Sequence, residues 1–417
     1  MATDEWLSYG GVELINLART TALAESLGID TLWTDPDAVA WVEDARNGHD
    51  YDLVTTAPWY DAGFPASSEF AGIVPLSISG LDDSTKESTT TEYITAGGSS
   101  SKPRNKTLSL PFNVAIIAST ERGADFGKRW LDRLLSGRSR STFCSGEDLH
   151  YYQWGPSDET PLPPLVHRRD VTVSRGTSVT RKRSTYCSAT WLVTFTLVAN
   201  DPFEYGEPVP QFLNLGNGSG VIAAPGGQPL VSSGQMPLIE SSCPVYDYAP
   251  IYDPLYPALV APPTAPDFYP EGWDFEDGDS IYRFWVRVPP TEPSSLGLVP
   301  VVTLRASADA RMVRVRVWPG NADTSSMCDP LWTAYVTYVM KDVDFVIDAE
   351  QQASYVWDGF SPVVRRADSL VYGEEATPVG WESFNSPEGL LVTLDFRTPG
   401  FVPGSITASL ALVPKSD

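Results

Sequence analysis

Short runs of alternating or β-branched apolar residues dominate this chain, and they predict strands. The strongest run is Trp191–Ala199, which is β-branched and aromatic and is bounded by polar residues. Similar patterns predict the other strands of the first half of the chain: residues 12–16, 68–79, 107–118, 141–144, 150–154, 171–174 and 187–200. Between the first two of these, residues 33–57 are predicted as polar loop and strand.

Two segments follow helical spacing instead. The first is a short helix expected over Leu17–Leu27, which Gly28 can end in the left-handed conformation. The second is expected over residues 125–136, where large apolar residues recur every four positions. Asp125 is its expected N-cap and Gly137 its end. The resulting fold class is mainly β with one or two helices.

Residues 80–107 turn polar between two predicted strands and carry a glycine- and serine-rich tip at 97–101. One interpretation is a disordered surface loop. The other is a long hairpin arm, because threonine and aromatic residues in this segment favour strands. A long polar hairpin is too thin to be stable alone, so it would need a partner to lie against. The candidate contact residues for a subunit interface are Leu81, Thr89, Thr91, Tyr93 and Ile94.

The second half of the chain begins with a Pro- and Tyr-rich connector. We place this linker at residues 246–270, between an N-terminal domain at 1–245 and a C-terminal domain at 271–417. Eight short strands without a helical pattern predict a β-sandwich or jelly roll in the C-terminal domain. They are expected at residues 280–288, 299–306, 310–318, 334–340, 343–347, 370–372, 390–396 and 405–412.

The charge balance narrows the classes of partner. The 417 residues contain 29 Lys and Arg against 53 Asp and Glu, a net charge of −24. This disfavours a sequestered nucleic acid and an anionic membrane, since both need basic neutralisation. Residues 122–183 are the exception, with a local net charge of +5. This basic segment is either a solvated mixed face or a complement to acidic surfaces on neighbouring copies or partners.

The termini and apolar runs predict no targeting or membrane segment. The start, MATDEW, has neither a basic nor an apolar region typical of a signal peptide, so we expect synthesis in the cytoplasm. The longest apolar runs are strand-sized, and no membrane insertion is expected.

No catalytic, cofactor or metal site is predicted. The four cysteines never form a C-x-x-C pair, and no G-x-S-x-G elbow precedes a helix. The glycine-rich run 216–220 lacks the G-K-[ST] ending of a phosphate loop, and the acidic turn 274–279 departs from a calcium loop. Trp357 and Trp381 are candidates for glycan stacking, with burial in the core as the alternative.

Four stretches, in this order, resemble the distal tail proteins (minor tail proteins) of long, non-contractile-tailed phages of mycobacteria and related actinobacteria. They are YGGVELINLARTTAL at 9–23, APWYD with EFAGIVPLSISGLDDST at 57–85, ERGADFGKRWLDRLL at 121–135, and the strand 187–203 followed by the connector 246–266.

The resemblance implies a structural virion protein at the distal end of the tail. Six copies would form a ring from N-terminal domains of sandwich or split-barrel type, with the hairpin as a belt around the neighbouring subunit. Galectin-like C-terminal domains would point outward, and DNA would pass through the channel. The implied partners are the tail tube, tape measure and hub or baseplate proteins. Two alternatives stay open, a module that binds host cell-wall glycan and a cell-wall hydrolase.

Overall fold

The computed structural model describes most of the chain as two compact units. The described residues are 4–31, 34–46, 48, 50–83, 86–92, 98–102, 104–136, 146–153, 164–211, 214–215, 220–221, 281–289, 297–308, 310–320, 330–358, 364–373, 378–381, 383–384, 388–397 and 406–416. Contacts divide the chain into Met1–Glu207 with Asp417 (unit 1) and Pro208–Ser416 (unit 2).

The division falls before residue 245, where we predicted the first domain to end. Strand β13 (Val209–Gln211) pairs with β25 (Ile406–Ser416), and β14 (Asn214–Leu215) pairs with β16 (Ile281–Val288). These short strands therefore belong to unit 2. The predicted linker at 246–270 lies outside the described residues and stays a prediction.

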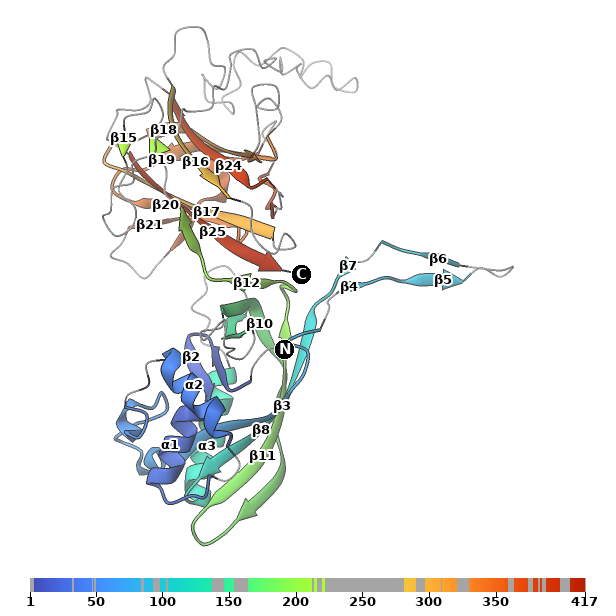
Figure 1. Cartoon of the computed structure of the whole chain (residues 1–417), viewed down its shortest axis with the longest axis vertical. Coiled ribbons are helices and arrows are strands. Elements are labelled where there is room, and N and C mark those ends of the chain that lie inside the picture. Colours follow the sequence, from blue (N-terminus) through green and yellow to red (C-terminus); the bar gives the residue numbers. More distant parts are fainter. Residues whose placement is uncertain are drawn as a thin grey trace. The chain divides into compact units, whose positions relative to one another are not determined.

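Unit 1 is built on antiparallel strands that run in the spatial order β2-β1-β9-β10-β11-β8-β3. Figure 1 shows β11, β8 and β3 side by side. Their bounds are β1 Trp6–Tyr9, β2 Val12–Asn16, β3 Phe70–Ile78, β8 Leu108–Ala118, β9 Glu147–Tyr152, β10 Leu165–Ser184 and β11 Ala189–Ala199. Strand β12 (Glu204–Gly206) pairs with the first part of β10, beside β11. The strands predicted around residues 12–16, 68–79, 107–118, 150–154 and 187–200 are confirmed, whereas 141–144 lies outside the described residues.

Three α-helices lie in the described part of unit 1: α1 Leu17–Ser26, α2 Pro36–Arg46 and α3 Glu121–Leu135. The first and third confirm the two predicted helices. The predicted N-cap of α3 is wrong, because Thr120 accepts the Gly123 N–H at 3.0 Å and the helix starts four residues before Asp125. Short 3-10 helices, η1 Val54–Thr56 and η2 Pro65–Glu69, precede β3.

Helix α2 corrects the prediction of loop and strand over residues 33–57. Only Val42 of this helix is fully buried, so its apolar periodicity is weak. Its start does follow a rule of helix capping, since the Asp35 carboxylate accepts the Asp37 N–H at 3.0 Å and Pro36 takes the first helical position.

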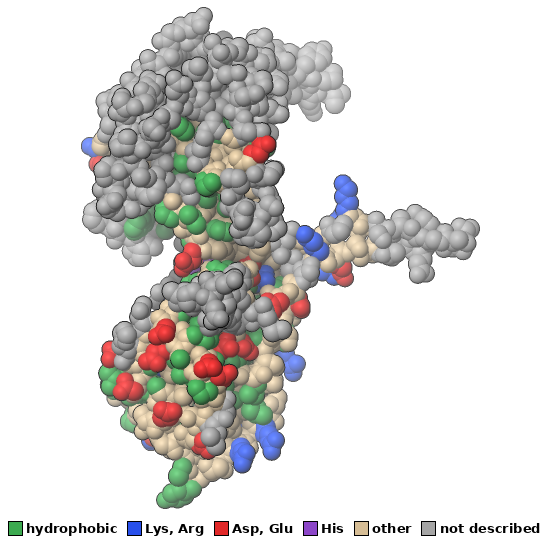
Figure 2. All heavy atoms as spheres, in the orientation of Figure 1, with side chains coloured by type: hydrophobic (Ala, Val, Ile, Leu, Met, Phe, Trp, Pro, Cys, Tyr) green, Lys and Arg blue, Asp and Glu red, His purple; other side chains and the backbone are tan. Residues whose placement is uncertain are grey.

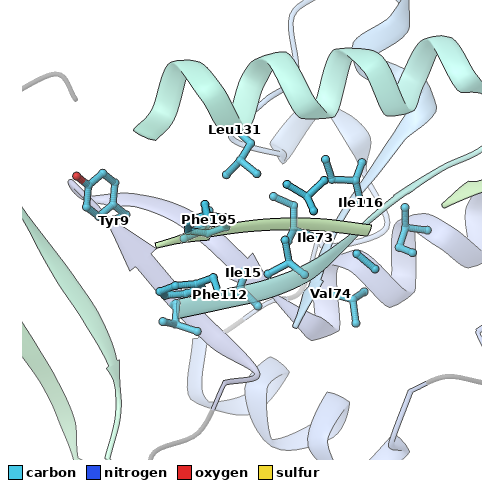
Figure 3. Close-up of a cluster of buried hydrophobic side chains, with 14 of the residues drawn as sticks. Tyr9, Ile15, Ile73, Val74, Phe112, Ile116, Leu131 and Phe195 are labelled. Carbon is cyan, nitrogen blue, oxygen red and sulfur yellow. The ribbon is translucent and has the colours of Figure 1, made fainter. Parts of the chain in front are cut away.

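The core of unit 1 lies between the strands and helices α1 and α3 (Figure 3). Strand β11 alternates fully and partly buried residues along its whole length, as a strand with one face on the core should. The rings of Phe112 and Phe195 stack across β8 and β11 with centroids 4.7 Å apart. Gly127 lets α3 approach the Phe70 ring, because an added Cβ would lie 2.6 Å from it. Burial of the Phe70 ring against α3 therefore holds this helix on the sheet.

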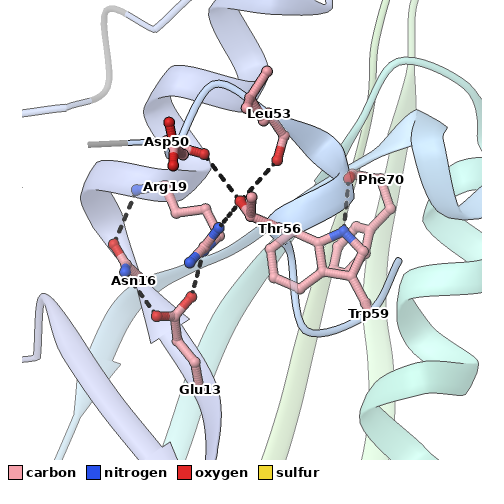
Figure 4. Close-up of polar contacts among 8 residues, drawn as sticks. All are labelled: Glu13, Asn16, Arg19, Asp50, Leu53, Thr56, Trp59 and Phe70. Carbon is pink, nitrogen blue, oxygen red and sulfur yellow. Dashed lines mark hydrogen bonds and ion pairs between the residues drawn. The ribbon is translucent and has the colours of Figure 1, made fainter. Parts of the chain in front are cut away.

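The start of α1 is held by a polar network (Figure 4). The Asn16 side chain accepts the Arg19 N–H at 2.9 Å and so caps the helix. Arg19 donates to Glu13 Oε1 at 2.7 Å and to Thr56 Oγ1 at 2.8 Å. Trp59 Nε1 donates to the Phe70 carbonyl at 3.1 Å. The Arg19 bonds tie the start of α1 to β2 and η1, and the Trp59 bond ties the segment after η1 to β3.

Tyr9 makes unit 1 sensitive to alkaline pH. Its hydroxyl donates to the Val171 carbonyl at 3.0 Å, and burial, reinforced by the charge of Glu147, raises the Tyr9 pKa to about 12. The unfolded chain loses this proton near pH 10. The contribution of Tyr9 to stability is therefore complete below about pH 10 and is lost as the pH rises toward 12.

We expect Tyr9→Phe to lower the free energy of unfolding at neutral pH by about 1–2 kcal/mol, since the buried Val171 carbonyl loses its donor. The same change should flatten the fall of stability between pH 10 and 12, measured by urea unfolding across that range. Tyr186→Phe is the matched control, because Tyr186 is fully exposed. An unchanged alkaline slope in Tyr9→Phe would contradict the assignment.

The described strands of unit 2 form two antiparallel sheets. One has the order β13-β25-β17-β20-β21-β22, and the other has the order β15-β14-β16-β24-β18-β19-β23. The strands not yet given are β15 Gly220–Val221, β17 Gly297–Ala306, β18 Ala310–Pro319, β19 Trp332–Val339, β20 Asp344–Asp348, β21 Ala353–Trp357, β22 Arg365–Arg366, β23 Val371–Tyr372 and β24 Leu390–Arg397. A 3-10 helix, η4 Asp368–Leu370, precedes β23.

The eight strands predicted in this half are confirmed within a few residues of their bounds. Strand β21 was missed, because its five residues show too little alternation. Both sheets contribute to one apolar core, which includes Val302 and Phe345 from the first sheet and Val315 and Val392 from the second. This shared core is the arrangement of a β-sandwich. Its galectin-like character stays a prediction.

Candidate functional site: the hairpin arm and its root

The polar segment after β3 forms a hairpin arm, which we define as residues 82–107. Its inner ladder pairs β4 (Lys86–Glu87) with β7 (Arg104–Asn105), and its outer ladder pairs β5 (Thr90–Glu92) with β6 (Gly98–Ser100). Figure 1 shows the arm extending away from the helices of unit 1. Within the described residues, these four strands form two-stranded sheets only.

The arm continues the ladder between β3 and β8. In that ladder Ile78 pairs with Phe112, and the Ser79 N–H donates to the Pro111 carbonyl at 3.2 Å. Burial falls along β3 from Phe70, which is fully buried, to Leu76, which is 49% exposed at a bulge. The ladder of β3 and β8 therefore begins in the core, and its side chains become exposed where it leaves the core toward the arm.

Leu81 and Gly80 mark the point where the arm leaves the body. Leu81 is buried in the core of unit 1. Gly80 has φ +92°, and an added Cβ would lie 2.5 Å from the Ser109 carbonyl oxygen. This position therefore requires glycine, both for its backbone conformation and for the close approach of β8.

A buried arginine holds the root of the arm. Arg168 on β10 donates to the Leu81 carbonyl at 2.8 Å and to the Pro202 carbonyl at 2.9 Å. Its guanidinium lies 3.7 Å from the Glu204 carboxylate, and both side chains are nearly buried. One side chain thus connects three segments that are far apart in sequence.

Glu204 is fixed by two further donors. Tyr151 Oη donates to Glu204 Oε2 at 2.6 Å, and Gln153 Nε2 donates to Oε1 at 2.8 Å. Burial raises the Tyr151 pKa well above its ordinary value. The phenol therefore keeps its proton and remains a donor throughout the neutral range.

The structure places only some of the predicted interface residues. Leu81 lies in the core at the root, where its side chain anchors the arm. Thr89 is exposed, and its backbone pairs with Ser101. Thr91 pairs with Ser99 in the outer ladder. Tyr93 and Ile94 lie outside the described residues. The interface itself stays a prediction.

The two candidate glycan residues have different environments. Trp357 is 41% exposed at the end of β21, which is compatible with ligand stacking. Trp381 is partly buried and packs against the core of unit 2.

Arg168 is the residue that the sequence analysis missed. It has the same strand phase as the buried Val166, two positions earlier. A charged residue in the apolar phase of a strand is the signal that could have found it, since a buried charge needs partners.

Two further kinds of feature, a metal-binding cluster and a membrane-spanning helix, are absent from the described residues. They contain no group of three or more His, Cys, Asp or Glu side chains that could hold a metal ion. None of the helices in these residues combines the length and apolarity needed to cross a bilayer.

No family model matches the sequence, and no curated protein matches it. Among solved structures, the chain is similar to the SPP1 Dit protein, described as a paradigm of hub adsorption apparatus in Gram-positive infecting phages. That match has a TM-score of 0.38 and 10% identity, and it covers 85% of this chain and 96% of the other. A chain of the phage P2 baseplate in its activated conformation with Ca matches with a TM-score of 0.40 and 10% identity, over 83% of this chain and 90% of the other.

Proposed function

We propose that this chain is a structural protein of a phage tail tip. In this proposal six copies form a ring at the distal end of the tail, and the ring joins the tail tube to the hub or baseplate. The ring leaves a channel for DNA, and its other partners are the tail tube and tape measure proteins. The family resemblance of the four sequence stretches supplies the number of copies and the position in the virion.

The hairpin arm is the observation that carries the proposal. Isolated two-stranded ribbons are marginal in water, because they bury little apolar surface. The root of this arm is nevertheless fixed by three features. Gly80 allows its close approach to β8, Leu81 is buried in the core, and Arg168 donates to the Leu81 carbonyl. A ribbon anchored in this way is suited to lie along a second protein surface, and in a ring that surface is the neighbouring subunit.

The charge of the chain is compatible with DNA passage. Six copies at −24 each would carry six times −24, or −144. A channel wall of the same sign as DNA lets the duplex slide, since attraction to phosphates would hold it. The proposal therefore requires the basic residues of segment 122–183 to face away from the channel.

Negative-stain microscopy of the purified protein tests the proposal. We expect class averages with six-fold symmetry and a central hole, at protein concentrations where the ring is populated. Monomers in solution together with absence of the protein from the tail tip of intact particles would contradict it.

A second role, binding of host cell-wall glycan, is favoured by the exposure of Trp357. Trp357→Ala should then weaken binding of the protein to isolated cell wall. Trp381→Ala serves as the comparison, because this side chain packs on the core. If the unmodified protein does not bind cell wall, this role is excluded.

A further inference from the structure

We propose that copies of this chain associate head to tail through two oppositely charged faces of unit 1. The acidic face is formed by α2 and its flanking turns, and the basic face by the end of the β10–β11 hairpin. The inference rests on the proposed ring, to which it assigns the contact between neighbouring copies.

The acidic face comes from one stretch of sequence. Residues 25–61 contain nine Asp and Glu and a single Lys or Arg, Arg46. Its exposed members on and around α2 include Asp35, Asp37, Glu43, Asp44, Asp50 and Asp52. In the described part of the chain, Glu43, Asp44 and Asp52 form no ion pair. Arg46 lies over the Trp6 ring, 4.2 Å from its centroid.

The basic face is the far end of the β10–β11 hairpin. Residues 171–199 contain four Lys and Arg and no acid. They are Arg181, Lys182 and Arg183 near the end of the hairpin and Arg175 closer to its base, all exposed. Lys182 Nζ lies 3.5 Å from the centroid of the Trp191 ring, its partner across the β10–β11 ladder. Among the described residues, Arg175, Arg181 and Arg183 have no acidic partner.

The two faces lie on different sides of unit 1. Figure 2 shows acidic side chains gathered where Figure 1 places α1 and α2, and Lys and Arg along the opposite edge. Ion pairs within one copy would therefore not neutralise them. The unpaired charges on these two sides of unit 1 are most directly neutralised by the oppositely charged face of a neighbouring copy.

The same charges determine the orientation of that neighbour. Two basic faces or two acidic faces would repel, so a symmetric face-to-face dimer is disfavoured. The basic face of one copy attracts the acidic face of the next, which is a heterologous contact. Such contacts continue from copy to copy and close into a ring when the rotation between copies permits.

The edge of β10 favours this arrangement further. Beyond Val171, no described strand pairs with the outer edge of β10, and the strand carries three irregularities in its pairing with β11. Basic side chains and bulges on an exposed edge discourage pairing with a like edge. The same basic side chains do not oppose the binding of an acidic surface to this edge.

Sedimentation velocity at low ionic strength tests the inference with charge reversals. One variant carries Glu43→Lys, Asp44→Lys and Asp52→Lys, and the other carries Arg181→Glu, Lys182→Glu and Arg183→Glu. Each alone should weaken self-association roughly ten- to a hundredfold, as several repulsive pairs replace attractive ones. Arg365→Glu with Arg366→Glu in unit 2 is the control, since both residues are exposed and should not affect the contact.

Recombining the reversals gives the decisive result. A chain with both reversals should associate as the unmodified protein does, and a mixture of the two variants should associate in alternation. Self-association of the unmodified protein should weaken with added salt. Monomers under all conditions, or single variants that associate normally, would overturn the inference.

These outcomes separate the inference from the ring itself. Six-fold rings that persist in each of the two single-face variants would support the proposed function and reject the charged contact. Salt-sensitive association that is rescued by double reversal, without closed rings in micrographs, would support the contact and reject the ring.

Discussion

Replacing residues 83–106 with a two-residue Asn-Gly turn is expected to leave unit 1 folded and to abolish six-fold rings. The fold should survive because Leu81, Leu108 and Leu110, which anchor the root in the core, are retained. A type I′ turn suits the twist of the shortened β3–β8 hairpin. Rings should disappear because the ribbon that we propose to lie on the neighbouring subunit is gone. Class averages of negatively stained protein measure the result.

A smaller deletion is the matched control. Removing residues 97–102 takes away β6 and the outer ladder but keeps the inner pairing of β4 with β7. We expect it to weaken rings less than loss of the whole arm. Unchanged rings after removal of 83–106 would contradict the belt-like role of the arm.

Arg168→Met is expected to cost about 3–5 kcal/mol in the free energy of unfolding of unit 1, the range for breaking one side of a buried charge pair. The change leaves Glu204 buried without its cation and the Leu81 and Pro202 carbonyls without their donor. Urea unfolding measures the loss, with the two units followed as separate transitions if they do not unfold together.

Two comparisons show whether the effect comes from the network. Arg181→Met makes the same chemical change at an exposed position and should alter stability by less than about 0.5 kcal/mol. Adding Glu204→Gln to Arg168→Met should recover part of the loss, because the unpaired charge is removed. Hydrogen exchange should also become faster at Leu81 and its neighbours. Equal effects of Arg168→Met and Arg181→Met would reject the role of Arg168.

Local patterns predicted most elements of the fold, because those elements bury one face. The alternation of Trp191–Ala199 appears in the structure as the alternating burial of β11, and the four-residue spacing after Phe126 appears in α3. Helix α2 was missed, since with only Val42 fully buried it leaves almost no apolar period to detect. Its capping residues, Asp35 and Pro36, carried the signal that periodicity lacked.

Some features of the candidate site were likewise predictable from local sequence, and others were not. The sequence alone determined that a polar segment with strand propensity and a glycine-rich tip follows β3, because these are local properties. The pairing of its strands chose the hairpin over the disordered loop. It also determined the net charge and the two stretches of opposite sign. Leu81, in contrast, was predicted to touch a neighbour, and only its packing revealed it as an anchor.

The tertiary structure decided how the arm is held and where the charges lie. Arg168, Leu81, Pro202 and Glu204 are separated by up to more than a hundred residues, and no local pattern states that they meet. Their contact depends on which strands pair and in which register. The separation of the acidic and basic faces depends likewise on the packing of α2 and on the course of the β10–β11 hairpin. Strand propensity and charge are properties of single residues and their sequence neighbours. Which distant residues come into contact depends on the long-range pairing of strands and its register.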